Sequence, residues 1–352
     1  MPRQIEKTVI LAKLETTYGT DATPTGAADA VLVSSPQAIP LQANNVDRAL
    51  VRGYFGGSEQ LVGTASKAVT FDVELAGSGT PTTPTQWGRL LQACGFSQTI
   101  GAASVDYLPT STFGASSSLT IYYQLDGEQH KLLGARGTFS LAMGVGERPL
   151  LRFRFVGLDG GATATANATP TLTAYQVPVV VTDQNSGDIL LGPTYTPATG
   201  VLSAGTAYPS RGLALDVNNR VSYQALLGGE SVEITGRDVN GNISFDLTAA
   251  QAVSFLTDVK ANTTTSLGFT HGITAGNIVV IYGPKVQRVD PTFEDMEGRA
   301  MSRYNTRFVP SSGNDELRIV TRRGARRACS AWTRTPPSPR RCCSRGPATN
   351  PR

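Results

Sequence analysis

The side chains that could carry out chemistry are few and lie far apart in the sequence. The two histidines, His130 and His271, have no second metal-binding side chain at helical or hairpin spacing. Asp72 and Glu74 are two residues apart, which places them on one side of a strand, but nothing predicts a partner carboxylate across a cleft. No nucleophile, phosphate-binding, dinucleotide-binding or zinc-protease motif is present. We therefore predict a protein that is not an enzyme, with no catalytic residues, no cofactor and no metal.

The four cysteines do not form a recognisable site either. Cys94 falls on the apolar side of a predicted helix and is interpreted as a small buried hydrophobic residue. Cys329, Cys342 and Cys343 lie in the final stretch, 321–352, which holds nine arginines and no carboxylate. This stretch could be a basic arm for nucleic acid or a weak metal knuckle. Its composition favours an out-of-frame artefact or a disordered extension, because it cannot bury enough apolar surface to fold alone.

The net charge of +4 conceals an acidic body. Without residues 321–352 the chain has 22 basic and 27 acidic side chains, a balance of −5. No apolar run approaches the ~20 residues of a membrane helix. The first 15 residues lack the cleavage site of a secretory signal. We expect a protein that is made in the cytoplasm and does not enter a membrane.

The elements that position these residues are organised around a block that occurs twice, at 44–75 and 218–247. Each copy opens with an Asn pair, continues with Gly-Gly and a following Glu, and closes on an alternating strand with Phe-Asp. The alternative is a repeat by chance. The same features recur in the same order in both copies, which favours a duplication over chance. The spacing far exceeds the 20–50 residues of solenoid repeats, which predicts two whole domains. The matched pairs are Asn44 and Asn218, Gly56 and Gly228, and Phe71 and Phe245, with offsets of 174, 172 and 174.

The match continues beyond the block. Each copy is followed by a segment with helical spacing of apolar residues. The first stripe is Trp87, Leu90, Leu91 and Cys94, and the second is Ala252, Val253, Leu256 and Val259. A last strand then repeats, with Arg154-Phe155-Val156 matching Arg307-Phe308-Val309 at an offset of 153. The extra residues of the first copy are assigned to a Gly/Ser/Thr-rich loop, 95–118. We predict domains at 1–170 and 171–320, with 321–352 as the extension.

Alternation and turn signals predict the strands. In 69–75 every second residue is apolar, so Asp72 and Glu74 share the polar side, which faces either solvent or the lumen of a ring of sheets. Asp126-Gly127 between apolar runs indicates a tight hairpin. Further strands are expected at 7–14, 137–143, 150–158, 177–182, 277–282, 285–289, 299–309 and 317–320.

Two segments leave alternatives open. The stretch 16–29, rich in Gly, Thr and Pro, is either a mobile connector or an arm that orders against a neighbouring subunit. Tyr54 and Phe55 stand beside Gly56-Gly57 in a predicted hairpin or long loop. Their rings either fold back onto their own sheet or are buried by another subunit.

Composition and pattern together indicate a mainly β protein. The chain has 37 Gly and 21 Pro, and only 16% of its residues are charged. These values suit strands joined by turns. The sequence therefore supports a duplicated, β-rich, non-enzymatic binding module or structural subunit.

Several segments resemble the major tail tube proteins of long-tailed, non-contractile bacteriophages, in their duplicated-domain form. They are LETTYGTDATPT near the N-terminus, LLGGESVEITGRD around Gly228-Gly229, THGITAGNIVVIYGPKVQ from Thr270, and the terminal FVPSSGNDELRIV. The resemblance covers roughly residues 5–320. It implies two tandem antiparallel β-sandwich or barrel domains, each with one flanking helix.

The resemblance also implies an assembly. Six such domains form a ring, so that three chains make a pseudo-hexamer, and rings stack into a hollow tube that conducts double-stranded DNA. It implies a place in the virion tail, assembly in the host cytoplasm, and contacts with a tape measure protein and with tail terminator and distal tail proteins. An acidic lumen would let DNA slide, because like charge repels phosphate. Lumen candidates are Asp72, Glu74 and Asp246. Candidates for contacts between rings are Tyr54, Phe55, Gly56, Gly57, Gly228, Gly229 and the stretch 16–29.

Two other functions compete with this one. A β-sandwich carbohydrate-binding or adhesin protein would need an exposed aromatic platform, and only 7% of the residues are aromatic. A DNA-binding protein would act through the basic end of the chain.

Overall fold

The computed structural model describes residues 2–114 and 117–322. This part of the chain is mainly β, and its two helices are α1 (Gly88–Ala93) and α2 (Ala249–Lys260). Neither helix has the length and apolar composition needed to cross a membrane. Cys329, Cys342 and Cys343 and most of the predicted extension lie outside the described residues. Thr321 and Arg322, which were assigned to this extension, belong to a strand.

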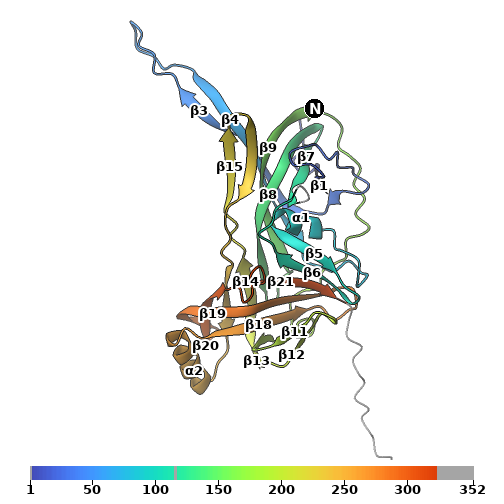
Figure 1. Ribbon diagram of the computed structural model, residues 1–352, viewed down its shortest axis with the longest axis vertical. Helices are drawn as coiled ribbons and strands as arrows, with labels where there is room; N and C mark the ends of the chain where they lie inside the picture. The colour runs from blue at the N-terminus through green and yellow to red at the C-terminus, as the bar shows by residue number, and fades with distance from the viewer. Residues whose placement is uncertain (1, 115–116, 323–352) are drawn as a thin grey trace, which may run out of the picture.

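The first half of the chain forms a series of antiparallel neighbours in the order β3-β4-β9-β8-β7-β1-β2 (Figure 1). Helix α1 follows β4 in the chain. The strands are β1 (Thr8–Leu14), β2 (Ala30–Val31), β3 (Ser34–Asp47), β4 (Gln60–Glu74), β7 (Leu119–Leu125), β8 (Glu128–Gly144) and β9 (Leu150–Ala164).

The second half has neighbours in the order β14-β17-β20-β19-β18-β10-β13. Each position has its counterpart in the first half, and α2 follows β17 as α1 follows β4. The strands are β10 (Ile189–Leu191), β13 (Thr206–Tyr208), β14 (Ser210–Asp216), β17 (Asn240–Phe245), β18 (Thr264–His271), β19 (Ile278–Met296) and β20 (Arg299–Phe308).

The two halves join edge to edge. Residues 140–144 of β8 pair with residues 212–216 of β14, so one sheet runs through both halves as β3-β4-β9-β8-β14-β17-β20-β19. We call it the central sheet. A second connection pairs β6 with β21. The remaining strands are β5 (Phe96–Ile100), β6 (Ser104–Pro109), β11 (Thr194–Thr196), β12 (Val201–Ser203), β15 (Val221–Leu226), β16 (Gly229–Ile234) and β21 (Arg318–Arg322).

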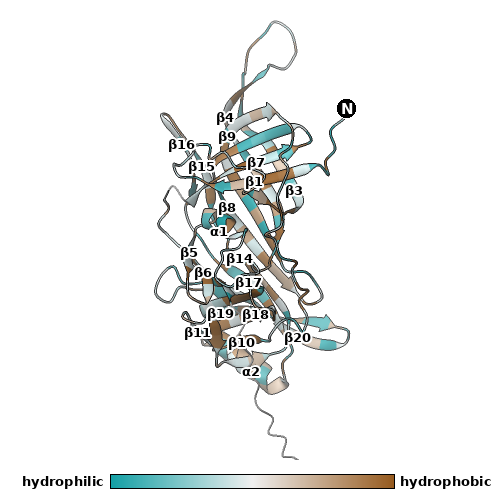
Figure 2. Cartoon of the chain, turned by 90° about the vertical axis from the view of Figure 1, so that its right-hand side faces the viewer, coloured by the Kyte–Doolittle hydropathy of each residue, from teal (hydrophilic) through white to brown (hydrophobic). Residues whose placement is uncertain are grey.

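The core of the first half confirms the predicted alternation. Val69, Phe71 and Val73 of β4 are buried on one side of the strand. The Phe71 ring lies 6.0 Å from that of Phe153, its neighbour on β9. The apolar stripe of α1 is buried as predicted, and the indole of Trp87 donates a hydrogen bond of 2.8 Å to the carbonyl of Ala76. Figure 2 shows hydrophobic residues on the strands of both halves.

The second core differs from prediction at α2. Phe255 is the buried residue of this helix, and its ring meets those of Phe245 and Tyr304 at 5.8 Å each. The predicted stripe included Val253 and Leu256, but these side chains are 64% and 36% exposed. Ala252 and Val259 of the stripe are half-buried, and Val259 packs against the core, so the prediction is correct for part of the stripe only.

Local predictions had mixed outcomes. Asp126 and Gly127 both have positive φ and connect β7 to β8, so the tight hairpin is confirmed. No strand forms at 177–182, and the second half opens at β10 instead. The predicted loop 95–118 contains the β5–β6 hairpin, whose Tyr107 is buried.

The stretch 16–29 is packed against its own half. Glu15, 1% exposed, precedes it and accepts hydrogen bonds from the backbone of Gly19 and from the hydroxyl of Thr120. Asp21, within the stretch, pairs with Lys131 at 2.8 Å. The stretch is therefore held by its own chain and is not a mobile connector, and its contact with a neighbouring subunit stays a prediction.

The matched last strand is out of register with the rest of the repeat. Phe71 lies opposite Phe153, whereas its counterpart Phe245 lies opposite Ser302. An offset of 153 would place Thr306 there. Neither the β4–β9 nor the β17–β20 pairing contains a bulge, so the two halves differ by four residues in the register of these whole strand pairs.

Candidate assembly surfaces and channel face

One side of the central sheet covers the cores, and the opposite side is polar. We call this second side the polar face. Short uncharged side chains alternate on it with charged ones, as strand periodicity requires. Its residues include Thr70, Asp72, Thr138, Ser140, Arg152, Arg154, Ala214, Asp216, Asn240, Asn242, Arg303, Asn305 and Arg307.

Carboxylates on the first half of the polar face are paired with arginines. Asp72 accepts from Arg152 through both oxygens, at 2.9 and 3.2 Å, and the two residues are direct neighbours across β4 and β9. Hydrogen bonds and the charge of Asp72 raise the pKa of Arg152. Glu74 pairs with Arg148 at 2.9 Å. The negative charge of both carboxylates is therefore compensated within the chain.

The second half repeats this compensation. Asp246 pairs with Arg299 at 2.6 Å and Asp238 with Arg307 at 3.2 Å. Glu294 accepts hydrogen bonds from Ser244 and Arg303, which lower the pKa of its carboxyl. A polymer with one sign of charge therefore meets alternating local charges on this face, with no uniform field to hold it.

A hollow of about 960 Å³ lies on the polar face where the two halves meet. Strands β8, β14, β17, β19 and β20 all contribute to it. Ser140, Asn240, Asn242 and Asn305 line it with short neutral groups. Asp216, Asp238, Asp290 and Arg307 also line it, so the hollow combines neutral hydrogen-bonding groups with charged ones.

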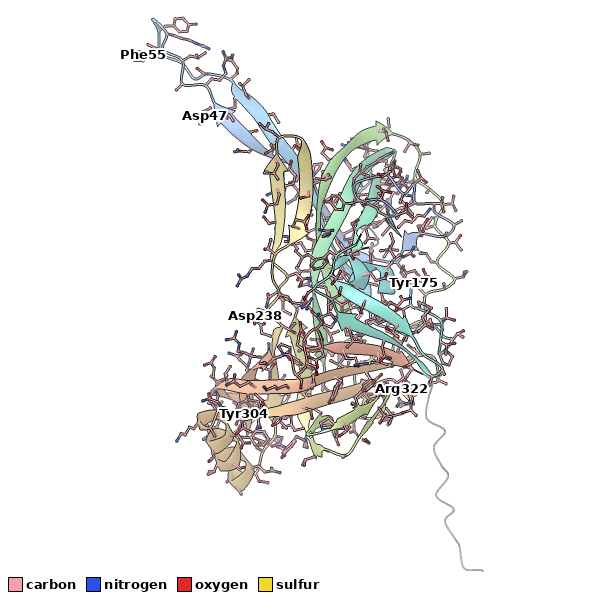
Figure 3. All side chains as sticks on the ribbon, viewed as in Figure 1. Asp47, Phe55, Tyr175, Asp238, Tyr304 and Arg322 are labelled. Carbon is pink, nitrogen blue, oxygen red and sulfur yellow. The ribbon has the colours of Figure 1, made fainter. Side chains whose placement is uncertain are left out.

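A long two-stranded ribbon extends from the central sheet. We call residues 42–65, the outer parts of β3 and β4 with their connection, the arm. Figure 3 shows Phe55 at its far end and Asp47 nearer the sheet. Val51 and Phe55 are 101% and 107% exposed, and Tyr54 is 70% exposed. An isolated hairpin is marginally stable in water, so a ribbon with an apolar tip indicates a surface meant for a partner.

A second hairpin, β15–β16, lies against the first half. Val232 is fully buried, and its backbone exchanges hydrogen bonds with the hydroxyl of Tyr18 and the guanidinium of Arg136. Its turn is exposed, with Leu227 107% exposed and Gly228 at φ +88°. One end of this hairpin is therefore fixed, while its tip presents an apolar side chain to solvent.

A buried polar cluster holds the two halves at their second connection. The carboxylate of Asp106 on β6 accepts from Arg318 on β21 at 2.5 Å, from Tyr195 at 2.7 Å and from Ser104 at 2.7 Å. The guanidinium of Arg318 stacks on the Tyr195 ring at 4.6 Å. Burial, and then the hydrogen bond to Asp106, raise the pKa of Tyr195, so its hydroxyl stays protonated as a donor.

These surfaces can be compared with known families. A family model described as phage tail tube protein matches residues 6–316. This chain belongs to the phage tail tube protein family. A search of curated proteins found no match.

Membership in the tail tube family decides the broad predictions. The family is structural and non-enzymatic, as the absence of motifs predicted. It implies self-assembly into a tube and a place in the phage tail. The mainly β fold is confirmed. These findings favour the tube over the carbohydrate-binding and DNA-binding alternatives.

The predicted contact residues of this tube protein lie on two tips. Tyr54, Phe55, Gly56 and Gly57 are exposed at the end of the arm, so the rings do not fold back onto their own sheet. Gly228 lies in the turn of β15–β16, and Gly229 is the first residue of β16. Their contacts between rings stay a prediction.

The lumen candidates lie on or beside the polar face, and their place in a lumen stays a prediction. Asp72, Glu74 and Asp246 were expected to give an acidic surface, and each is ion-paired with an arginine. The acidic balance of the body is not concentrated there. Net charge counted along a sequence cannot reveal which cross-strand neighbours neutralise each other.

Sequence reasoning missed the cluster that joins the halves of the tube protein. Asp106 lies in a segment predicted to be a loop, and Arg318 lies in a strand predicted without a partner. The alternation of Val105 and Tyr107 around Asp106 was the available signal.

Proposed function

We propose that this tube protein is a tandem duplicate of one β domain, and that three chains close into a pseudo-hexameric ring. The domains are 1–170 and 171–320. Rings stack into the tail tube of a long-tailed, non-contractile phage and conduct double-stranded DNA. The repeated block and the same succession of strand neighbours in both halves support the duplication.

One observation carries the ring: the central sheet ends in strand edges that have no partner within the described chain. β3 pairs with β4 alone, and residues 292–296 of β19 pair with β20 alone. Such edges invite pairing with another chain, and closure removes them. Each half contributes four strands, so three chains would give about 24 strands. At about 4.8 Å per strand the circumference is at least ~115 Å, which leaves a wide central channel.

The polar face is proposed as the channel wall, with Asp72, Glu74 and Asp246 among its residues. Its alternating charges and short amides avoid a phosphate-binding surface, because DNA affinity grows with the number of uncompensated cations. Paired arginines therefore serve passage as well as an acidic wall would. The tape measure protein would occupy the same channel before DNA, and tail terminator and distal tail proteins would bind the tube ends.

Contacts between rings are proposed for the exposed tips. The arm presents Tyr54, Phe55, Gly56 and Gly57, and the β15–β16 turn presents Gly228 and Gly229. The arm and α2 lie at opposite ends of the longest axis of the chain (Figure 1). Apolar tips exposed in one chain would be buried by another on stacking.

Electron microscopy of the purified, assembled protein tests this function. Class averages should show hollow rings with three chains and six similar lobes, stacked into tubes. A solution monomer that never assembles, or rings built from six chains, would contradict the proposal.

A further inference from the structure

We propose that the contact between chains repeats the contact between halves. The outer edge of β3 in one chain pairs antiparallel with residues 292–296 of β19 in the next. We call this the chain seam, and the β8–β14 pairing the internal seam. The inference rests on the proposed ring and adds which strands close it and in what register.

The internal seam is a complete template. Asp216 lies opposite Ser140, Leu215 opposite Leu141 and Leu213 opposite Met143. Leu141, Leu213 and Leu215 are only 2–3% exposed. The seam therefore joins backbone edges and buries an apolar row on the core side.

Strand β3, whose outer edge has no partner in the described chain, occupies the position in the first half that β14 occupies in the second. β3 is the outer neighbour of β4, as β14 is the outer neighbour of β17. Both strands begin with a bulge that carries a positive φ, +51° at Ser35 and +104° at Gly212. The two strands are thus shaped alike before they meet a partner.

The far end of β19 holds the position of the far end of β8. The first part of β8 pairs with β7, and the first part of β19 pairs with β18. Both β8 and β19 then continue beyond the end of this neighbour. On this edge β8 continues with β14, whereas β19 has no further partner in the described chain. The missing neighbour of β19 is the one that β3 of another chain would supply.

The exposure of apolar side chains also indicates a missing neighbour at both edges. Phe293 of β19 is 79% exposed, and Leu41 of β3 is 50% exposed. The apolar row at the internal seam is buried by its partner strand. An apolar side chain left exposed on each of the two matching edges is explained if the opposite strand covers it.

The register follows from the phenylalanine rows. Phe71, Phe153 and Phe139 lie side by side in the first half, and Phe245, Ser302 and Phe293 do so in the second. Ser140 therefore corresponds to Glu294, the residue after Phe293. Asp216 corresponds to Gln42, because Gln42 lies opposite Ser66 and Asp216 opposite Asn240. The chain seam places Gln42 of one chain opposite Glu294 of the next.

Disulfide crosslinking tests this seam. The full chain, with serine at positions 329, 342 and 343, carries Gln42→Cys and Glu294→Cys together. After assembly and mild oxidation, a non-reducing gel should show a ladder that ends at a covalent trimer, with most of the protein crosslinked. Gln42→Cys with Glu128→Cys is the matched negative control, and Ser140→Cys with Asp216→Cys is the positive control for an internal-seam disulfide.

Microscopy separates the two proposals. If rings of three chains form and the internal-seam control oxidises, but Gln42→Cys/Glu294→Cys stays monomeric on the gel, the seam is refuted and the ring stands. If no rings form in the unsubstituted protein, the proposed function itself fails.

Discussion

Removing Arg318 should strongly destabilise the connection between the two halves. Arg318 is the cation of the buried cluster on β6 and β21, where Asp106 is 9% exposed at its side chain and Arg318 is 20% exposed. The substitution Arg318→Met keeps much of the apolar stem and removes the charge. Asp106 would then be a buried carboxylate without its counterion.

The size of the effect follows from burial. Breaking a buried ion pair from one side costs about 3–5 kcal/mol of unfolding free energy. The hydroxyls of Tyr195 and Ser104 still donate to Asp106 and offset part of this loss. We expect about 3 kcal/mol, a large fraction of the stability of an ordinary domain.

Urea denaturation of the unassembled chain measures this loss. Far-ultraviolet circular dichroism reports both halves, and in a Trp332→Phe background the buried Trp87 reports the first. Arg307→Met is the matched control. Its partner Asp238 is also an aspartate, but the two side chains are 56% and 53% exposed, so the expected loss is below about 1 kcal/mol.

The double variant tests the electrostatic reason. Arg318→Met with Asp106→Asn no longer buries an unpaired charge, and it should recover roughly half of the loss. An Arg318→Met loss no larger than that of Arg307→Met, or a double variant less stable than the single one, would refute the reasoning.

Three further outcomes are expected. Gly212→Ala should cost about 2 kcal/mol or more in urea denaturation, because φ is +104° and a Cβ would lie 2.0 Å from the carbonyl oxygen of Met143; an unchanged midpoint would contradict this. Burial lowers the pKa of His271, so the unfolded chain binds a proton that the folded chain resists, and stability should fall as the pH drops below about 6.5. His271→Gln should reduce the difference between urea midpoints at pH 7.5 and 5.5, and an unaltered difference would exclude this histidine as its source. Phe55→Ser should change the stability of the unassembled chain by less than about 0.5 kcal/mol while raising the concentration needed for tubes in sedimentation, whereas normal tubes would exclude the tip from stacking.

The sequence by itself determined the class of the protein and much of its local structure. The alternation around Phe71 is encoded in neighbouring residues, because side chains on a strand point to opposite sides in turn. Asp126-Gly127 was recognisable because few residues tolerate two successive positive φ values. The missing catalytic motifs and the repeated block also lie in the order of residues alone. These signals are local, and a single sequence displays them.

Only the tertiary structure decided which residues meet. Asp72 lies opposite Arg152 because β4 pairs with β9 in one register, and that pairing neutralised a face predicted to be acidic. Val253 of α2 turned outward because Phe255 filled the space against Tyr304. Asp106 found Arg318 across a separation of 212 residues. Pairing between distant strands depends on their register, on bulges and on how whole sheets pack. These are decided by the fold of the entire chain, so neighbouring residues in the sequence do not reveal them.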